Sequence, residues 1–224
     1  MALRRALVTG FEPYGGRGSN PAYDVMRALD GKEIGGVTIV GRGLPVSYAA
    51  LRQRIDELLG QVDPIAVLSL GLWPGEPVIR LERLAVNLTD FEIADNDGFI
   101  VTDGEVLGGG VLAMAATLPL REIERAMLAA GIPVRISGTA GSFLCNACLY
   151  HFLYASASRA VRRLCGFMHV PYLPSQVAEI LAGTRREGLY EVHQRADLAS
   201  MDVGTATRAA EIALGVTFAT GTLD

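Results

Sequence analysis

The feature that most constrains this fold is a series of short apolar runs that alternate with longer segments of helical pattern. The runs are rich in Val, Ile and Leu and show little polar alternation, which is typical of strands buried on both faces. Strands are predicted at residues 6–9, 38–40, 65–70, 84–88, 134–137 and 167–170. Helices are predicted at residues 21–29, 48–59, 119–130, 145–163 and 203–214. The alternation predicts an α/β fold, with an open twisted, mostly parallel sheet and helices on both faces.

Two segments interrupt this rhythm. Residues 90–110 contain Asp-Asn-Asp-Gly and a Gly-Gly-Gly run, and they are predicted to form a long surface loop of the kind that often covers a site or an interface. Residues 173–201 show no clear period and are expected to hold an irregular segment. A length of 224 residues is enough for one self-sufficient core, so we expect residues 1–224 to form a single domain.

Composition excludes several classes of protein. Twenty basic against twenty-four acidic residues give a net charge of −4, which disfavours a partner with a nucleic-acid backbone. No apolar run approaches the ~18 residues that a membrane span needs. The apolar run after the two N-terminal arginines is too short for an export signal. Three cysteines do not suggest a disulfide framework, so we expect a cytoplasmic protein with reduced thiols.

Cys145 lies where a β-branched run ends, a turn of small residues follows and a helix is predicted to begin. The positive end of the helix dipole favours a thiolate, the nucleophilic form of the side chain. Free backbone N–H groups at a helix start can also hold a developing oxyanion. The residues alone therefore allow a nucleophile here, while a small buried cysteine is the alternative interpretation.

A thiol nucleophile needs a base, and His169 is the best-placed of the three histidines. It ends an apolar strand, and ligand sites in open α/β sheets gather at the carboxyl ends of strands. His151 is six positions after Cys145 on the same predicted helix and should point elsewhere, while His193 lies in a polar stretch and should be solvated. A buried histidine bonded to a carbonyl is the alternative for His169.

Glu82 is the candidate for the group that orients the imidazole, because a carboxylate in an apolar strand is costly unless it is paired. A structural ion pair is the alternative. The loop at residues 9–21 lacks the Lys-Ser/Thr of a phosphate loop, and Pro13 removes a donor. Phe11 and Tyr14 in that loop instead suit an apolar slot for a flat ring.

Cys145 and Cys148 also form a Cys-x-x-Cys pair at a helix start. This spacing makes a thiol-disulfide oxidoreductase the competing hypothesis, although a thioredoxin-like unit places such a pair after an early strand. A single pair without further Cys or His ligands is a weak zinc signal, and no metal site is predicted.

Taken together, these segments resemble the pyroglutamyl peptidase I family, the pyrrolidone carboxyl peptidases, which are cysteine peptidases. The resemblance runs from residue 7 to about residue 176 and fades after it. Its motifs are LVTGFEPYGG at 7–16, Asn-Pro at 20–21, ERLAVN at 82–87, DNDG at 95–98, TAGSFLCN at 139–146 and GFMHVPYLP at 166–174.

The resemblance implies that Cys145 is the nucleophile, His169 the general base and acid, and Glu82 the orienting carboxylate. It implies a peptide substrate whose N-terminus is blocked as a pyroglutamyl ring, with no metal or cofactor, and a homotetrameric assembly. It also implies a ring pocket, which maps onto Phe11, Tyr14, Asn20, Ile93, Phe143 and Leu144. Tyr14 and Phe143 are expected to sandwich the lactam.

Three positions depart from the family pattern. Leu72 replaces a usual Gln, residues 74–76 read Pro-Gly-Glu in place of Gly-Gly-Arg, and Glu92 replaces an arginine near the active site. Loss of an amide contact with a buried lactam should cost ~1–3 kcal/mol of binding. We therefore expect a weak or shifted pyroglutamyl preference, with Leu72 and Glu92 lining an altered pocket. A family member that binds without hydrolysing is a further hypothesis.

Overall fold

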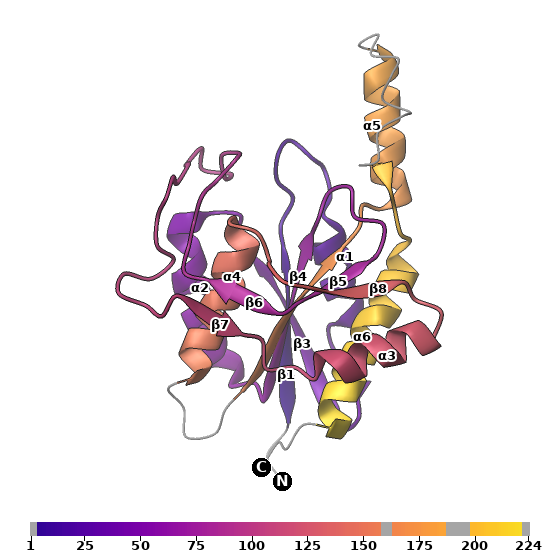
Figure 1. The fold of residues 1–224 in the computed structure, drawn as a ribbon. Coiled ribbons are helices and arrows are strands. Elements are labelled where there is room, and N and C mark those ends of the chain that lie inside the picture. Colours follow the sequence, from indigo (N-terminus) through magenta and orange to yellow (C-terminus); the bar gives the residue numbers. More distant parts are fainter. Residues whose placement is uncertain (1–3, 158–162, 187–197, 221–224) are drawn as a thin grey trace.

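The computed structural model describes residues 4–157, 163–186 and 198–220 (Figure 1). Its strands are β1 (Arg5–Phe11), β2 (Glu33–Ile34), β3 (Val37–Leu44), β4 (Ala66–Leu72), β5 (Ile79–Glu82), β6 (Leu84–Val86), β7 (Ala113–Ala115), β8 (Val134–Ser137) and β9 (Leu164–Val170). Its helices are α1 (Pro21–Leu29), α2 (Tyr48–Val62), α3 (Leu120–Ala129), α4 (Leu144–Ala157), α5 (Pro174–Arg186) and α6 (Val203–Thr220).

The main sheet has seven strands in the order β2-β3-β1-β4-β9-β5-β8. Strands β3, β1, β4 and β9 run parallel to one another. Strand β5 is antiparallel to β9 and parallel to β8, and β2 is an antiparallel edge strand beside β3. The predicted α/β fold with a mostly parallel sheet is confirmed.

Helices cover both faces of the sheet, with α2 and α4 on one side and α1, α3 and α6 on the other (Figure 1). Alternate residues of one strand pack against the helices on the two sides of the sheet, because successive side chains point to opposite faces. In β1, Ala6 and Val8 pack with the second group of helices, whereas Leu7 packs with the first. Both layers are closely filled, which explains why the strands read as continuous apolar runs.

Several predicted elements need correction. The strand expected at 84–88 is β6, which pairs only with β7 in a small separate sheet. The strand of the main sheet is β5, and it was hidden by the charged residues in its short sequence. The segment expected to be irregular is a helix over Pro174–Arg186, opened by a proline at its first turn. Helix α4 extends to Ala157, and residues 158–162 of its predicted span lie outside the described residues. His193 also lies outside the described residues.

The loop at residues 90–110 is fixed to the body by Asp95. Its Oδ1 accepts hydrogen bonds from the backbone N–H groups of Asp97 and Phe99 at 3.0 and 2.9 Å. Its Oδ2 accepts a 2.8 Å bond from the N–H of Tyr48, the first residue of α2. The loop start is therefore held against α2 and against the ends of the parallel strands.

Asn146 fixes the start of α4 to β6 and to the residues that follow it. Its Nδ2 donates to the carbonyls of Val86 and Leu88 at 2.9 Å, and its Oδ1 accepts a 2.9 Å bond from the N–H of Val86. The side chain is completely buried. The first turn of α4 therefore has a defined place above the sheet.

We predict that Asn146→Ala lowers the free energy of unfolding by about 2–3 kcal/mol, because it removes the three hydrogen bonds that this completely buried side chain makes with the backbone of Val86 and Leu88. Asn96→Ala is the matched control: Asn96 is exposed and bonds Glu12 and the carbonyl of Pro13, so we expect a loss below about 1 kcal/mol. Urea denaturation of both variants measures the difference. Equal losses would show that Asn146 does not anchor the helix.

Candidate active site

A cavity of about 480 Å³ opens where the parallel strands β1, β4 and β9 end. Parallel strands carry their carboxyl ends at one edge of a sheet, and this is where α/β proteins place ligands. Here the last residues of β1 and β4, Phe11 and Leu72, line the cavity together with His169 near the end of β9. The loop at 90–110 and the start of α4 complete the wall.

The residues selected from the sequence are brought together. The cavity lining includes every predicted pocket residue, namely Phe11, Tyr14, Asn20, Leu72, Glu92, Ile93, Phe143 and Leu144, and also the proposed nucleophile and base, Cys145 and His169. Glu82 lies behind His169 and does not reach the cavity. The arrangement places the candidates in one site, while their chemical roles stay predictions.

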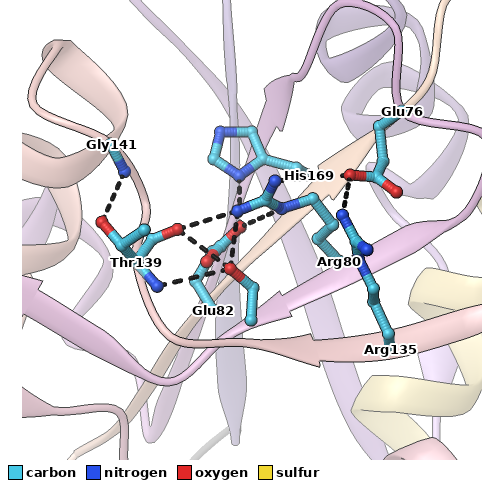
Figure 2. Close-up of polar contacts among 8 residues, drawn as sticks. Glu76, Arg80, Glu82, Arg135, Thr139, Gly141 and His169 are labelled. Atoms are coloured by element: carbon cyan, nitrogen blue, oxygen red, sulfur yellow. Dashed lines mark hydrogen bonds and ion pairs between the residues drawn. The ribbon is translucent and has the colours of Figure 1, made fainter.

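His169 and Glu82 form a buried pair across neighbouring strands. The antiparallel register sets Arg80 opposite His169 and Glu82 opposite Phe167, so alternate residues of the two strands share one face. Nδ1 of His169 lies 2.8 Å from Oε1 of Glu82 (Figure 2). The side chains are 1% and 0% exposed. An ionised carboxylate only accepts hydrogen bonds, so Nδ1 carries the hydrogen and Nε2 is left for the cavity.

Cys145 lies in the first turn of α4, beside the bare backbone of β4. A side chain on Gly71 would come within 2.9 Å of the Cys145 sulfur and 2.8 Å of the Phe167 ring. Gly71 is also the residue of β4 that pairs with His169. The missing side chain at Gly71 therefore allows the sulfur to sit close to the strand that carries the imidazole.

The packing around Cys145 opposes the thiolate that its place at the helix start favours. Burial raises the pKa of its thiol well above the usual range, and the nearby Cys148 and Glu82 raise it further. A backbone hydrogen bond at the helix start acts in the opposite direction, as the dipole argument requires, but it does not outweigh the burial.

The imidazole and the carboxylate complete a consistent charge state. Burial lowers the pKa of His169 below its usual value, although the hydrogen bond and charge of Glu82 oppose this. Burial alone would raise the pKa of Glu82, but the bond and charge of His169, followed by the hydroxyl of Ser137 and then the charge of Arg80, outweigh it and hold the pKa below its usual value. These shifts favour a neutral imidazole and an ionised carboxylate in the resting site.

Sequence reasoning missed the cation beside Glu82. Nε of Arg80 donates to Oε1 of Glu82 at 3.0 Å, whereas the adjacent Arg83 is exposed. The period of two along a strand was the available signal, since it puts residues 80 and 82 on one face and residue 83 on the other. It also missed part of the cavity lining, which includes Arg17, Val46, Trp73, Pro74, Asp90, Ala140, Gly141 and Ser142.

The ring pocket differs in detail from the expectation. The rings of Tyr14 and Phe143 have centroids 6.3 Å apart and are tilted by 41°, so they do not form the parallel walls of a sandwich. A flat ring needs about 3.5–4 Å of clearance on each face. Asn20 caps α1, since its Oδ1 accepts from the N–H of Ala22 at 3.1 Å. Leu72 supplies an apolar wall, and Glu92 is exposed at the rim.

The oxidoreductase hypothesis finds no support. Cys145, Cys148 and Cys165 are all free thiols. Cys148 is fully buried, its sulfur donates to Oγ of Ser69 at 3.5 Å, and burial raises its pKa to about 12. A resolving cysteine needs access and a low pKa, and Cys148 has neither. Within the described ranges, no group of three His, Cys, Asp or Glu side chains is arranged to hold a metal ion.

Comparisons with known proteins agree with this geometry. The family model described as pyroglutamyl peptidase matches residues 4–212. The pyrrolidone-carboxylate peptidase of Pyrococcus furiosus is 38% identical over 175 residues, covering 78% of this chain and 84% of that protein. The enzyme of the same name from Cupriavidus necator is 41% identical over 179 residues, covering 79% and 82%.

Solved structures give the same result. A variant of the pyrrolidone carboxyl peptidase from Pyrococcus furiosus superposes with a TM-score of 0.89 at 33% identity, covering 96% of this chain and 99% of that chain. The pyrrolidone carboxyl peptidase from Thermococcus litoralis superposes with a TM-score of 0.86 at 35% identity, covering 96% and 93%.

We predict that Gly71→Ala displaces the Cys145 sulfur and lowers its rate of alkylation by iodoacetamide at least tenfold, with a loss of about 1–3 kcal/mol in stability from overpacking. Gly60→Ala is the control, because a side chain on Gly60 within α2 meets nothing within 4 Å. That variant should keep the wild-type rate and gain stability through helix propensity. An unchanged rate in Gly71→Ala would contradict the close approach of the sulfur to β4.

Proposed function

Since this chain belongs to the pyroglutamyl peptidase family, we propose that it removes an N-terminal pyroglutamyl residue from peptides by acyl transfer. Cys145 is the nucleophile, His169 transfers the proton and Glu82 orients His169. The observation that carries this proposal is the 2.8 Å contact between Nδ1 of His169 and Glu82, which leaves Nε2 for the cavity that Cys145 also lines. A base fixed by a third group beside a nucleophile is the arrangement that such chemistry needs.

The first half of the reaction forms a thioester. The Cys145 sulfur bonds to the carbonyl carbon of the pyroglutamyl residue while its proton passes to Nε2 of His169. Backbone N–H groups at the start of α4 hold the oxyanion, since the first N–H groups of a helix have no partner within it. The C–N bond then breaks, and the leaving amine takes the proton from Nε2.

The second half restores the site. Water attacks the thioester carbon and gives a proton to Nε2, and the C–S bond breaks as that proton returns to the sulfur. Glu82 keeps Nδ1 as the donor throughout and stabilises the imidazolium that forms in each half. No step requires a metal ion or a cofactor.

The pocket is proposed to shift the substrate preference. Leu72 brings an apolar side chain where the family pattern has an amide, and Glu92 brings an anion where it has a cation. An exposed carboxylate at the rim favours a cationic group in the substrate, with a modest and salt-dependent effect. A side-by-side screen of amides with different blocked N-terminal residues measures this preference.

We further propose that the chain works in the cytoplasm as a homo-oligomer, a tetramer by family resemblance. Its three free thiols suit a reducing compartment. Leu112 and Val111 are 85% and 57% exposed beside β7, and Tyr154 is 47% exposed on α4. The ring of Tyr150 stacks on the ring of Tyr154, and its hydroxyl donates to the carbonyl of Val111. Tyr150 thus links Tyr154 to the segment of Val111 and Leu112, and we propose that the exposed side chains of these three residues form one apolar surface suited to a second copy. No described helix is long and apolar enough to span a membrane.

We predict that Cys145→Ala abolishes hydrolysis of a pyroglutamyl-coumarin amide, because no other group can form the thioester. Cys148→Ser is the control: its sulfur is buried and absent from the cavity lining, so turnover should stay within about threefold of wild type. Release of the fluorescent amine measures both. Full turnover in Cys145→Ala would remove the assignment, and loss of turnover in Cys148→Ser as well as in Cys145→Ala would favour a dithiol function.

We predict that Leu112→Glu reduces the mass of the particle measured by light scattering, because a charge would be buried between copies. Leu128→Glu, a change of the same kind at a side chain 55% exposed on α3, should leave the mass of the assembly unchanged. A monomeric wild-type chain, or an oligomer that survives the change at Leu112, would contradict the proposed interface.

A further inference from the structure

We propose that Arg80 is a positioning residue of this site: it ties Glu82 to the loop before Cys145 and limits the negative charge that Glu82 offers to His169. This inference rests on the proposed function only for its kinetic test. The family resemblance covers the segment around Arg80 but assigns it no role, and the residue is not in the cavity lining. Arg80 therefore acts through other residues and not on the substrate.

The guanidinium of Arg80 joins two parts of the site. Nε donates to Oε1 of Glu82 at 3.0 Å, the same oxygen that meets Nδ1 of His169. Nη2 donates to Oγ of Ser137 at 2.6 Å and to the carbonyl of Thr139 at 3.0 Å. Thr139 belongs to the loop that leads from β8 into α4, six residues before Cys145. The side chain of Arg80 thus connects Glu82, which contacts His169, to the loop that leads to Cys145 (Figure 2).

Further contacts, with Glu76 and Trp73, hold the side chain of Arg80 in place. Its third nitrogen, Nη1, donates to Oε2 of Glu76 at 3.3 Å, and the Arg135 guanidinium bonds the same oxygen at 2.6 Å. Its flat face lies 3.8 Å from the ring centroid of Trp73, whose edge meets the His169 ring at 5.0 Å between centroids. The planar fork of arginine suits this combination of several donors and a stacked face, and lysine would not reproduce it.

The shared oxygen sets a competition between two cations. If the imidazole takes a proton, two cations, His169 and Arg80, contact the same carboxylate oxygen, Oε1 of Glu82. The other oxygen of Glu82, Oε2, is buried and has no hydrogen-bond partner among the residues described. The cation of Arg80 at the shared oxygen therefore opposes protonation of His169.

The charged groups around His169 come from three elements. Strand β5 supplies Arg80 and Glu82, and the segment between β4 and β5 supplies Glu76, which Arg135 of β8 partly neutralises. The side of His169 towards β4 meets Gly71, which has no side chain, and α4 brings the Cys145 side chain to the same cavity. The charge of Arg80 lowers the pKa of His169, and the charges of Glu82 and Glu76 raise it.

Opposite shifts in the pH profile test this assignment. Arg80→Gln removes the competing cation, so His169 takes a proton more readily. The apparent pKa of the acidic limb of the kcat/KM profile should therefore rise by about 1 pH unit. Glu76→Gln removes a charge that favours the imidazolium, so the limb should fall by about half a unit. Arg80→Lys keeps the charge and loses the fork, so the limb should stay near the wild-type position while kcat falls about tenfold.

Arg135→Gln is the matched control, because it removes an arginine of the same cluster that is 58% exposed and contacts Glu76 instead of Glu82. Its limb should lie within about 0.3 pH unit of wild type. A merely structural role for Arg80 would lower activity equally at every pH. An unmoved limb in Arg80→Gln and Glu76→Gln, or a shift of both in one direction, would overturn the proposal.

A second measurement separates this proposal from the proposed function. NMR titration of the histidine ring signals, with His169 identified by its absence from His169→Gln, follows its protonation without any substrate. The same opposite shifts are expected there. If wild type fails to cleave a pyroglutamyl amide while the shifts appear, the function is wrong and the role of Arg80 stands. If it cleaves and the shifts are absent, the role of Arg80 is wrong.

Discussion

The carboxylate of Glu82, with no exposed surface, is the constraint on which the rest of the site depends. A buried charge is costly unless it is paired and hydrogen-bonded. Its partners lie on two strands, Arg80 on β5, the strand of Glu82 itself, and His169 on β9, so the contact with His169 depends on the register of β5 against β9. The pair therefore specifies the position of β5 as well as the orientation of the imidazole.

The burial of the sulfur bears on the reactivity of the site. Burial opposes ionisation of both Cys145 and His169, so transfer of the thiol proton to His169 is part of forming the nucleophile in the proposed reaction. A protonated thiol is a poor target for oxidants and metals. Binding of a substrate carbonyl near the N–H groups of α4 supplies the place where the developing charge is stabilised.

Much of the fold followed from periodicity, because buried strands and amphipathic helices leave local patterns. β1, β4 and β9 were predicted for that reason, and the grouping of Cys145, His169 and Glu82 came from the family resemblance. The reversal of β5, the small sheet of β6 and β7, and the contact of Arg80 with Thr139 depend on residues far apart in sequence, and the contacts of Arg80 with Trp73 and Glu76 depend on how the chain turns between β4 and β5. The effect of burial on Cys145 could not be predicted either, since helix position favours a thiolate and only the packing shows the burial that opposes it.

The most direct test of the account is covalent labelling with a pyroglutamyl chloromethyl ketone, read by mass spectrometry of the intact chain and of its peptides. The pocket and the nucleophile should act together, so the account predicts one label per chain on Cys145, with protection by a pyroglutamyl peptide. Labelling should be lost in His169→Gln, where no base takes the thiol proton. Labelling of Cys148, or of Cys145 at an equal rate by a ketone that lacks the lactam, would contradict it.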